Sequence, residues 1–74
     1  MQSEIQISLA AARINAKMTQ EEAANRLKIS KRTIINWEND KTLPSFAELN
    51  MLSDIYGIPV DNIFLPLKST LSGL

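Results

Sequence analysis

The sequence contains neither cysteine nor histidine. The missing thiols exclude disulfide bonds and thiolate zinc sites, and the missing imidazoles remove the commonest general base and metal ligand. Aromatic residues make up only 5% of the 74 positions, and no apolar run approaches the roughly 18 residues of a membrane helix. We therefore expect one small domain that is not an enzyme, needs no metal or cofactor, has no evident small-molecule ligand and does not enter a membrane. A cytoplasmic binding module fits these absences.

Positive and negative charges are equal in number but unevenly distributed. Residues 13–41 hold seven lysines and arginines against four acidic residues, while the rest of the chain holds Lys68 against four acidic residues. A neutral total thus conceals a basic centre flanked by acidic ends, an arrangement that favours a polyanionic partner. Chance patterning is the alternative at these counts.

Apolar periodicity and capping residues predict short helices throughout the chain. Thr19, Ser30 and Ser45 offer side-chain oxygens that cap helix starts, and Gly57 stands where a left-handed terminating residue is wanted. These signals bound helices at about residues 4–16, 19–27, 31–39, 45–57 and 59–64. No segment alternates as a strand does, so the predicted fold class is all-α, a compact domain of five short helices.

The second and third predicted helices are separated by a turn of about three residues. Such a turn makes the helices cross steeply, which requires a small side chain at the crossing, and Ala24 stands there. The helix over 31–39 then projects from the domain with side chains that match the hydrogen-bonding edges of bases in the DNA major groove. These side chains are Lys31, Arg32, Thr33 and Asn36.

Six short segments in register carry a family resemblance. They are MTQEEAA at 18–24, ISKRTI at 29–34, WEN at 37–39, PSF at 44–46, LNML at 49–52 and IYGIPVDNIF at 55–64. Together they resemble the Cro/C1-type (XRE family) helix-turn-helix DNA-binding domain, which is lambda repressor-like. The resemblance implies a DNA-binding domain at residues 9–64 with the helix-turn-helix at about 20–39. Residues 1–8 would then extend the first helix, and residues 65–74 would form a C-terminal tail.

The resemblance also implies roles for individual residues. Arg13 and Glu38 match a pair that forms a largely buried ion pair in family members. Matching positions in the family read base edges (Lys31, Arg32, Asn36), lie at the groove rim (Ser30, Thr33) or touch the DNA backbone (Gln20, Asn39, Lys41). Phosphate contacts of this kind fix register, while base contacts carry the sequence information.

Four positions depart from the family pattern. Lys28 and Asp40 stand where glycine is common, although a left-handed conformation costs a residue with a side chain about 1–2 kcal/mol. Ala23 replaces a usual leucine, and Ile35 is apolar where polar residues are common. None of the four removes the DNA-binding surface.

The function that the resemblance implies is sequence-specific binding of double-stranded DNA by a small transcriptional regulator. A repressor of phage or mobile-element type, which blocks polymerase at an operator, is the first expectation. The alternative is a protein-interaction module, such as the antitoxin of a toxin–antitoxin pair.

A homodimer is expected as well, because one recognition helix covers only a few base pairs and such domains usually pair on two-fold symmetric operators. Apolar residues at the end of the last predicted helix and just after it are expected to form or border the dimer contact. They are Ile63, Phe64, Leu65 and Leu67. The alternative is that this segment folds back on its own core.

Overall fold

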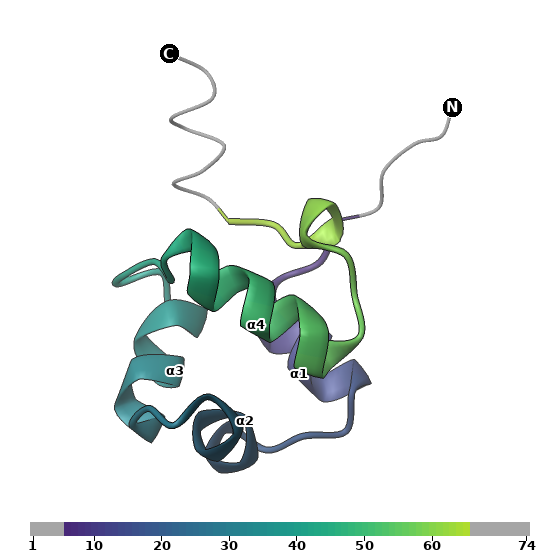
Figure 1. Cartoon of the computed structure of the whole chain (residues 1–74). Helices are drawn as coiled ribbons and strands as arrows, with labels where there is room; N and C mark the ends of the chain where they lie inside the picture. Colours follow the sequence, from purple (N-terminus) through teal and green to yellow (C-terminus); the bar gives the residue numbers. More distant parts are fainter. Residues whose placement is uncertain (1–5, 66–74) are drawn as a thin grey trace, which may run out of the picture.

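The computed structural model describes residues 6–65 of the chain. Its elements are α1 (Leu9–Asn15), α2 (Gln20–Leu27), α3 (Lys31–Glu38), α4 (Phe46–Tyr56) and the 3₁₀ turn η1 (Val60–Asn62). This arrangement, shown in Figure 1, confirms the all-α fold class and corrects the helix count. The fifth predicted helix is a single 3₁₀ turn, since Ile63 takes an extended conformation and ends it after three residues.

Each α-helix begins at a hydroxyl side chain. Thr19 and Ser45 form complete capping boxes with Glu22 and Glu48, in which each side chain bonds the backbone N–H of the other residue. Ser30 accepts from the backbone of the third residue of α3. The three capping positions expected from the sequence are therefore confirmed, and each removes an unpaired donor from a helix start.

The first helix starts later than the sequence predicts. Ser8 caps α1 by accepting from the Ala11 N–H, so the described residues before Leu9 are not helical. Instead, Ile7 forms an isolated parallel bridge with Ile63. The Ile7 N–H donates to the Asn62 carbonyl at 2.9 Å, and the Phe64 N–H donates to the Ile7 carbonyl at 2.8 Å. Pairing with the distant 62–64 segment thus replaces the expected helical extension; residues 1–5 lie outside the described part.

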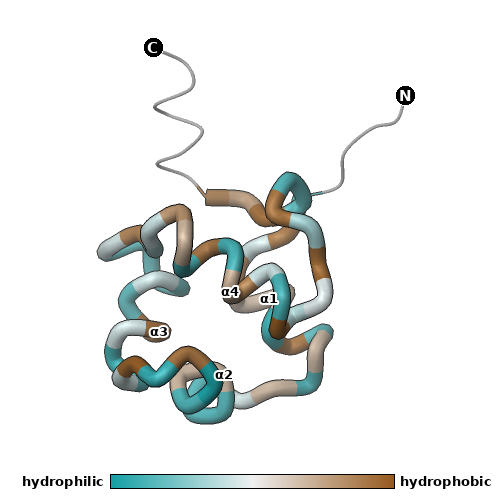
Figure 2. The backbone as a smooth tube through the Cα atoms, viewed as in Figure 1, coloured by the Kyte–Doolittle hydropathy of each residue, from teal (hydrophilic) through white to brown (hydrophobic). Residues whose placement is uncertain are grey.

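The core is built from apolar side chains that recur along each helix, as the brown positions in Figure 2 indicate. Ala23 and Ala24 are completely or almost completely buried, in keeping with the small side chain that the α2–α3 crossing requires. Ile34 and Trp37 are the buried residues of α3. Because these two side chains anchor α3 on one face, the opposite face of the helix is left for solvent.

The segment after η1 corrects the predicted dimer contact. Ile63 and Leu65 are 1% and 5% exposed and belong to the core of their own chain. Phe64, which lies between them, is exposed. The extended backbone of this segment explains the alternation, because successive side chains point to opposite sides. Two of the four predicted contact residues are therefore unavailable to a partner, and Leu67 lies outside the described residues.

Three residues with side chains adopt the left-handed conformation: Lys17, Lys28 and Asp40. Lys28 ends α2 at φ 60°, and its N–H donates to the Asn25 carbonyl. The only described glycine, Gly57, ends α4 at φ 68° as expected. Lys28 and Asp40 are the positions where the family commonly has glycine, so the fold keeps the glycine conformation with a side chain in its place.

Candidate nucleic-acid interface

The outward face of α3 carries the side chains predicted to read bases. Lys31 and Arg32 are exposed, while Thr33, Ile35 and Asn36 are partly exposed. Figure 1 shows α3 at the edge of the domain, with α2 and α4 on either side of it. An α-helix that projects in this way has the shape that enters the major groove. The structure thus brings Lys31, Arg32 and Asn36 together on one accessible helical face.

The start of α3 is held by hydroxyl groups. Ser30 Oγ accepts from the Thr33 N–H at 3.2 Å and lies 3.0 Å from Thr33 Oγ1. The two predicted rim residues therefore contact each other and fix the first turn of the helix. Ser30 is exposed and Thr33 is partly exposed, which is consistent with a place at the rim of a groove.

Arg13 and Glu38 form an ion pair that links α1 to α3. Arg13 Nε donates to Glu38 Oε2 at 2.7 Å, and Arg13 Nη2 donates to Glu38 Oε1 at 3.2 Å. The side chains are only 13% and 7% exposed. A third guanidinium nitrogen donates to the Met18 carbonyl at 2.9 Å. The hydrogen bond to Glu38 raises the pKa of Arg13 above its ordinary value, against the opposing effect of burial, so the Arg13 guanidinium stays charged.

Gln20 joins this pair from the first position of α2. Its Nε2 donates to Glu38 Oε1 at 3.0 Å, which places the amide between the ion pair and the surface. A carboxylate only accepts hydrogen bonds, so Glu38 fixes the orientation of the Gln20 amide with its nitrogen inward. One N–H of that nitrogen and the backbone N–H groups at the start of α2 remain for an acceptor outside.

A hollow of about 430 Å³ lies where α2 begins next to the start of α3. Its lining residues are Arg13, Met18, Thr19, Gln20, Glu21 and Lys31. Lys31, Gln20 and the positive end of the α2 dipole border the hollow and favour an anion such as a DNA phosphate, whereas the Glu21 carboxylate on the same lining opposes one. Lys31, predicted to read bases, is thus placed within reach of this hollow as well as of the groove face.

The remaining predicted backbone residues lie at the other end of α3. Asn39 is the C-terminal cap of that helix, and the Lys41 N–H donates to the Asn36 carbonyl at 2.9 Å. Asp40 between them takes φ 62° and turns the chain. Asn39 and Lys41 are exposed. The Gln20 amide bonds Glu38, the last residue of α3, and Gln20 also lines the hollow beside Lys31, so it lies along the side of this helix and not at one end of it.

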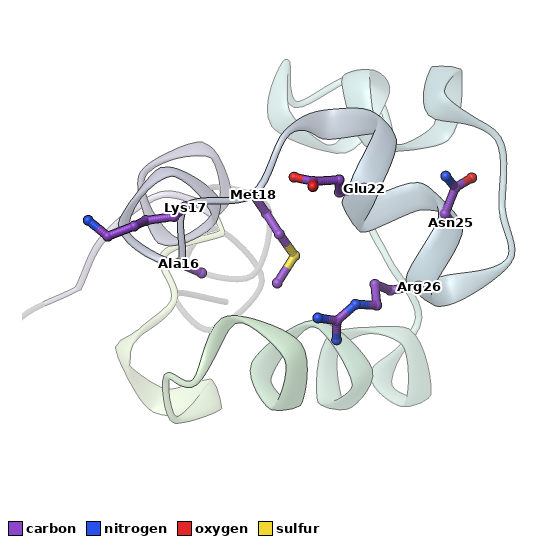
Figure 3. Close-up of a pocket in the computed structure, with 6 residues that line it drawn as sticks. All are labelled: Ala16, Lys17, Met18, Glu22, Asn25 and Arg26. Atoms are coloured by element: carbon purple, nitrogen blue, oxygen red, sulfur yellow. The ribbon is translucent and has the colours of Figure 1, made fainter.

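A second hollow, of about 420 Å³, lies on the side of α2 that faces the end of α1. Its lining residues are Ala16, Lys17, Met18, Glu22, Asn25 and Arg26. Figure 3 shows Lys17 and Arg26 on opposite sides of the opening, with Met18 between them. This hollow, whose lining includes Lys17 in the left-handed conformation, was not predicted from the sequence. The Glu22 carboxylate is already bonded to the Thr19 N–H, so the capping box accounts for it.

Within residues 6–65, no helix is long and apolar enough to cross a membrane. Over the same range, no group of three or more acidic side chains lies together where a metal ion could be held.

The architecture and the exposed face of α3 define a helix-turn-helix protein. The helix-turn-helix family model matches residues 9–63, which is more than half of the chain. The chain belongs to the Cro/C1-type (XRE) helix-turn-helix family and is a DNA-binding regulator of that kind. No curated protein and no solved structure gave a significant match.

Proposed function

We propose that the chain is a sequence-specific transcriptional repressor of phage or mobile-element type, which binds its operator through α3. The observation that carries the proposal is the placement of Lys31, Arg32 and Asn36 on one accessible face. Arginine and lysine pair with guanine O6 and N7, and asparagine pairs with adenine N6 and N7. In this proposal Gln20, Asn39 and Lys41 hold the phosphate backbone, while Lys31, Arg32 and Asn36 read the bases.

Binding of the domain to its operator would be sufficient for repression. A bound domain excludes polymerase from the promoter without any chemical step. In this proposal, the interface side chains therefore have binding roles only.

We further propose that two copies bind a two-fold symmetric operator. Each domain contributes one recognition helix, which spans only a few base pairs. Of the predicted contact residues, Phe64 is the described one with an exposed side chain. Sedimentation equilibrium of the full chain should give the mass of a dimer at micromolar concentration. Phe64→Ala should shift that equilibrium toward monomer; an unchanged dimer mass would place the contact elsewhere.

The proposal is tested by selecting bound sites from random duplexes and then titrating two variants. Arg32→Ala should cost about 1–3 kcal/mol on the selected operator and reduce the preference at one or two base positions. Lys41→Ala should weaken all duplexes about equally and reduce the slope of log affinity against log salt by roughly one. Equal losses for Arg32→Ala on operator and scrambled DNA would make Arg32 a backbone contact.

The second candidate function, a module whose main partner is a protein such as a toxin, is favoured by one feature of α4. Phe46 and Met51 are 75% and 45% exposed on that helix, so two large apolar side chains of α4 are accessible to a partner. If neither Arg32→Ala nor Lys41→Ala changes any DNA affinity, the protein-partner function replaces the repressor. In that case Phe46→Ser should abolish partner binding and leave the fold intact.

A further inference from the structure

The outward face of α3 contains one aliphatic side chain, Ile35. Its neighbour Ile34 is 1% exposed and lies in the core, whereas Ile35 is only partly buried. Eight partly buried hydrophobic residues of the described chain pack against the core, and Ile35 is not among them. Folding of the domain therefore does not account for an isoleucine at this position.

Ile35 lies among the side chains proposed to read bases. It follows Lys31 by four positions and Arg32 by three, and residues at these spacings are neighbours on a helix surface. Asn36 is the next residue and lies on the far side of Arg32. The reading face thus consists of an aliphatic group and an amide on either side of a guanidinium group.

The major groove offers few apolar groups to such a side chain. Each base pair presents hydrogen-bond donors and acceptors there, and thymine adds its C5-methyl group. Arginine and asparagine can satisfy the donors and acceptors, but an isoleucine next to them would leave polar base edges without partners. A thymine methyl group is the feature of the groove that Ile35 can cover without that loss.

We propose that Ile35 is a specificity-determining residue that contacts the 5-methyl group of a thymine in the operator. The inference rests on the proposed function and adds to it a preference that hydrogen bonding by Lys31, Arg32 and Asn36 does not supply. 5-Methylcytosine carries the same methyl group, but duplexes made from unmodified synthetic DNA contain that group only in thymine, which identifies its source.

The test removes the methyl group from the DNA and leaves the protein unchanged. Each thymine of the selected operator is replaced in turn by deoxyuridine, which keeps base pairing and differs only by that methyl group. The wild-type chain should bind about fourfold more weakly at one thymine position per half-site, which corresponds to about 0.8 kcal/mol for one buried methyl group.

The matching protein variant, Ile35→Ala, completes a double-mutant cycle with the deoxyuridine substitution. Ile35→Ala should weaken binding to the thymine operator by about the same factor and should be indifferent to deoxyuridine at that position. The loss of affinity with both changes together should not exceed the loss with either change alone, because both changes remove the same contact. Ile14→Ala is the control: Ile14 is 62% exposed on α1, and this variant should keep both full affinity and the sensitivity to deoxyuridine.

Two results would overturn the inference. The first is wild-type binding that is unaffected by deoxyuridine at every thymine. The second is an Ile35→Ala variant that loses affinity equally on thymine and deoxyuridine duplexes, which would make Ile35 a support for neighbouring side chains. A chain that prefers no duplex at all would instead refute the proposed function. The deoxyuridine series on the wild-type chain needs no variant to fold.

Discussion

Gln20 Nε2 donates a hydrogen bond to Glu38 Oε1 at 3.0 Å. Glu38 also accepts two hydrogen bonds from Arg13, so one carboxylate holds side chains from α1 and α2 against α3. The amide proposed to contact DNA is therefore attached to a nearly buried ion pair. This arrangement limits the rotamers of Gln20 before any DNA arrives, which lowers the entropy lost on binding.

Replacing Gln20 by methionine tests the contact with the DNA backbone. The variant keeps the length of the side chain and removes its N–H donors, so all duplexes should bind more weakly by a similar factor. A hydrogen bond to a charged group contributes about 1.5–3 kcal/mol, and the loss should approach that range. Binding titrations on operator and scrambled duplexes measure it. Asn25→Ala, on the exposed surface of α2, is the control, and a loss confined to the operator would contradict a backbone role.

Replacing Arg13 by methionine should lower stability more than any surface change. Removal of one partner leaves the nearly buried Glu38 carboxylate without its counterion, at a cost of about 3–5 kcal/mol. That is a large part of the total stability expected of a small domain. Thermal and urea unfolding measure the effect. Arg26→Met at an exposed position of α2 should change stability by no more than about 0.5 kcal/mol, and equal effects of both variants would argue against the pair.

Lys28→Gly should stabilise the domain. Lys28 ends α2 in the left-handed conformation at φ 60°, which costs a residue with a side chain about 1–2 kcal/mol. The greater freedom of glycine in the unfolded chain offsets part of this, so the expected gain is about 0.5–1 kcal/mol. The shift of the urea midpoint measures it. The control variant Arg26→Gly, inside α2, should instead destabilise the domain by about 1 kcal/mol. A loss of stability in Lys28→Gly would mean that the lysine side chain stabilises the fold by more than the strained backbone costs.

Tyr56 should make the domain sensitive to alkali. Burial, with a smaller contribution from Glu38, raises the pKa of Tyr56 to about 12 in the folded state. The ordinary value is 10.0, so only the unfolded chain ionises between these two pH values. The contribution of Tyr56 to the free energy of unfolding is therefore fully present below pH 10. It falls by at most about 1.4 kcal/mol per pH unit as the pH rises toward 12.

Absorbance of tyrosinate measures this titration cleanly, because the chain has one tyrosine. Tyr56→Phe is the control, and the free energy of unfolding of the wild-type chain relative to this variant should fall above pH 10. Ionisation of Tyr56 in the folded chain near its ordinary pKa would show that the hydroxyl is in contact with water.

Local signals in the sequence were sufficient for most of the fold. Thr19, Ser30 and Ser45 cap helices where their spacing predicts, and Gly57 ends α4. Such features depend on hydrogen bonds within three or four residues, so they can be recognised without tertiary contacts. The start of α1 was predicted too early for the opposite reason. Ile7 pairs with the segment around Ile63, and nothing near Ile7 in the sequence reveals a partner so far along the chain.

The sequence by itself determined the helix-turn-helix, its family and the residue types on the reading face, because helical periodicity assigns Ile34 and Trp37 to the core and Arg32 to the outside. Only the tertiary structure decided that Ile63 and Leu65 fill their own core, and that Gln20 reaches Glu38. These contacts join residues that are distant in sequence. Their geometry is fixed by how the helices pack, and composition or spacing within one helix carries no information about that packing.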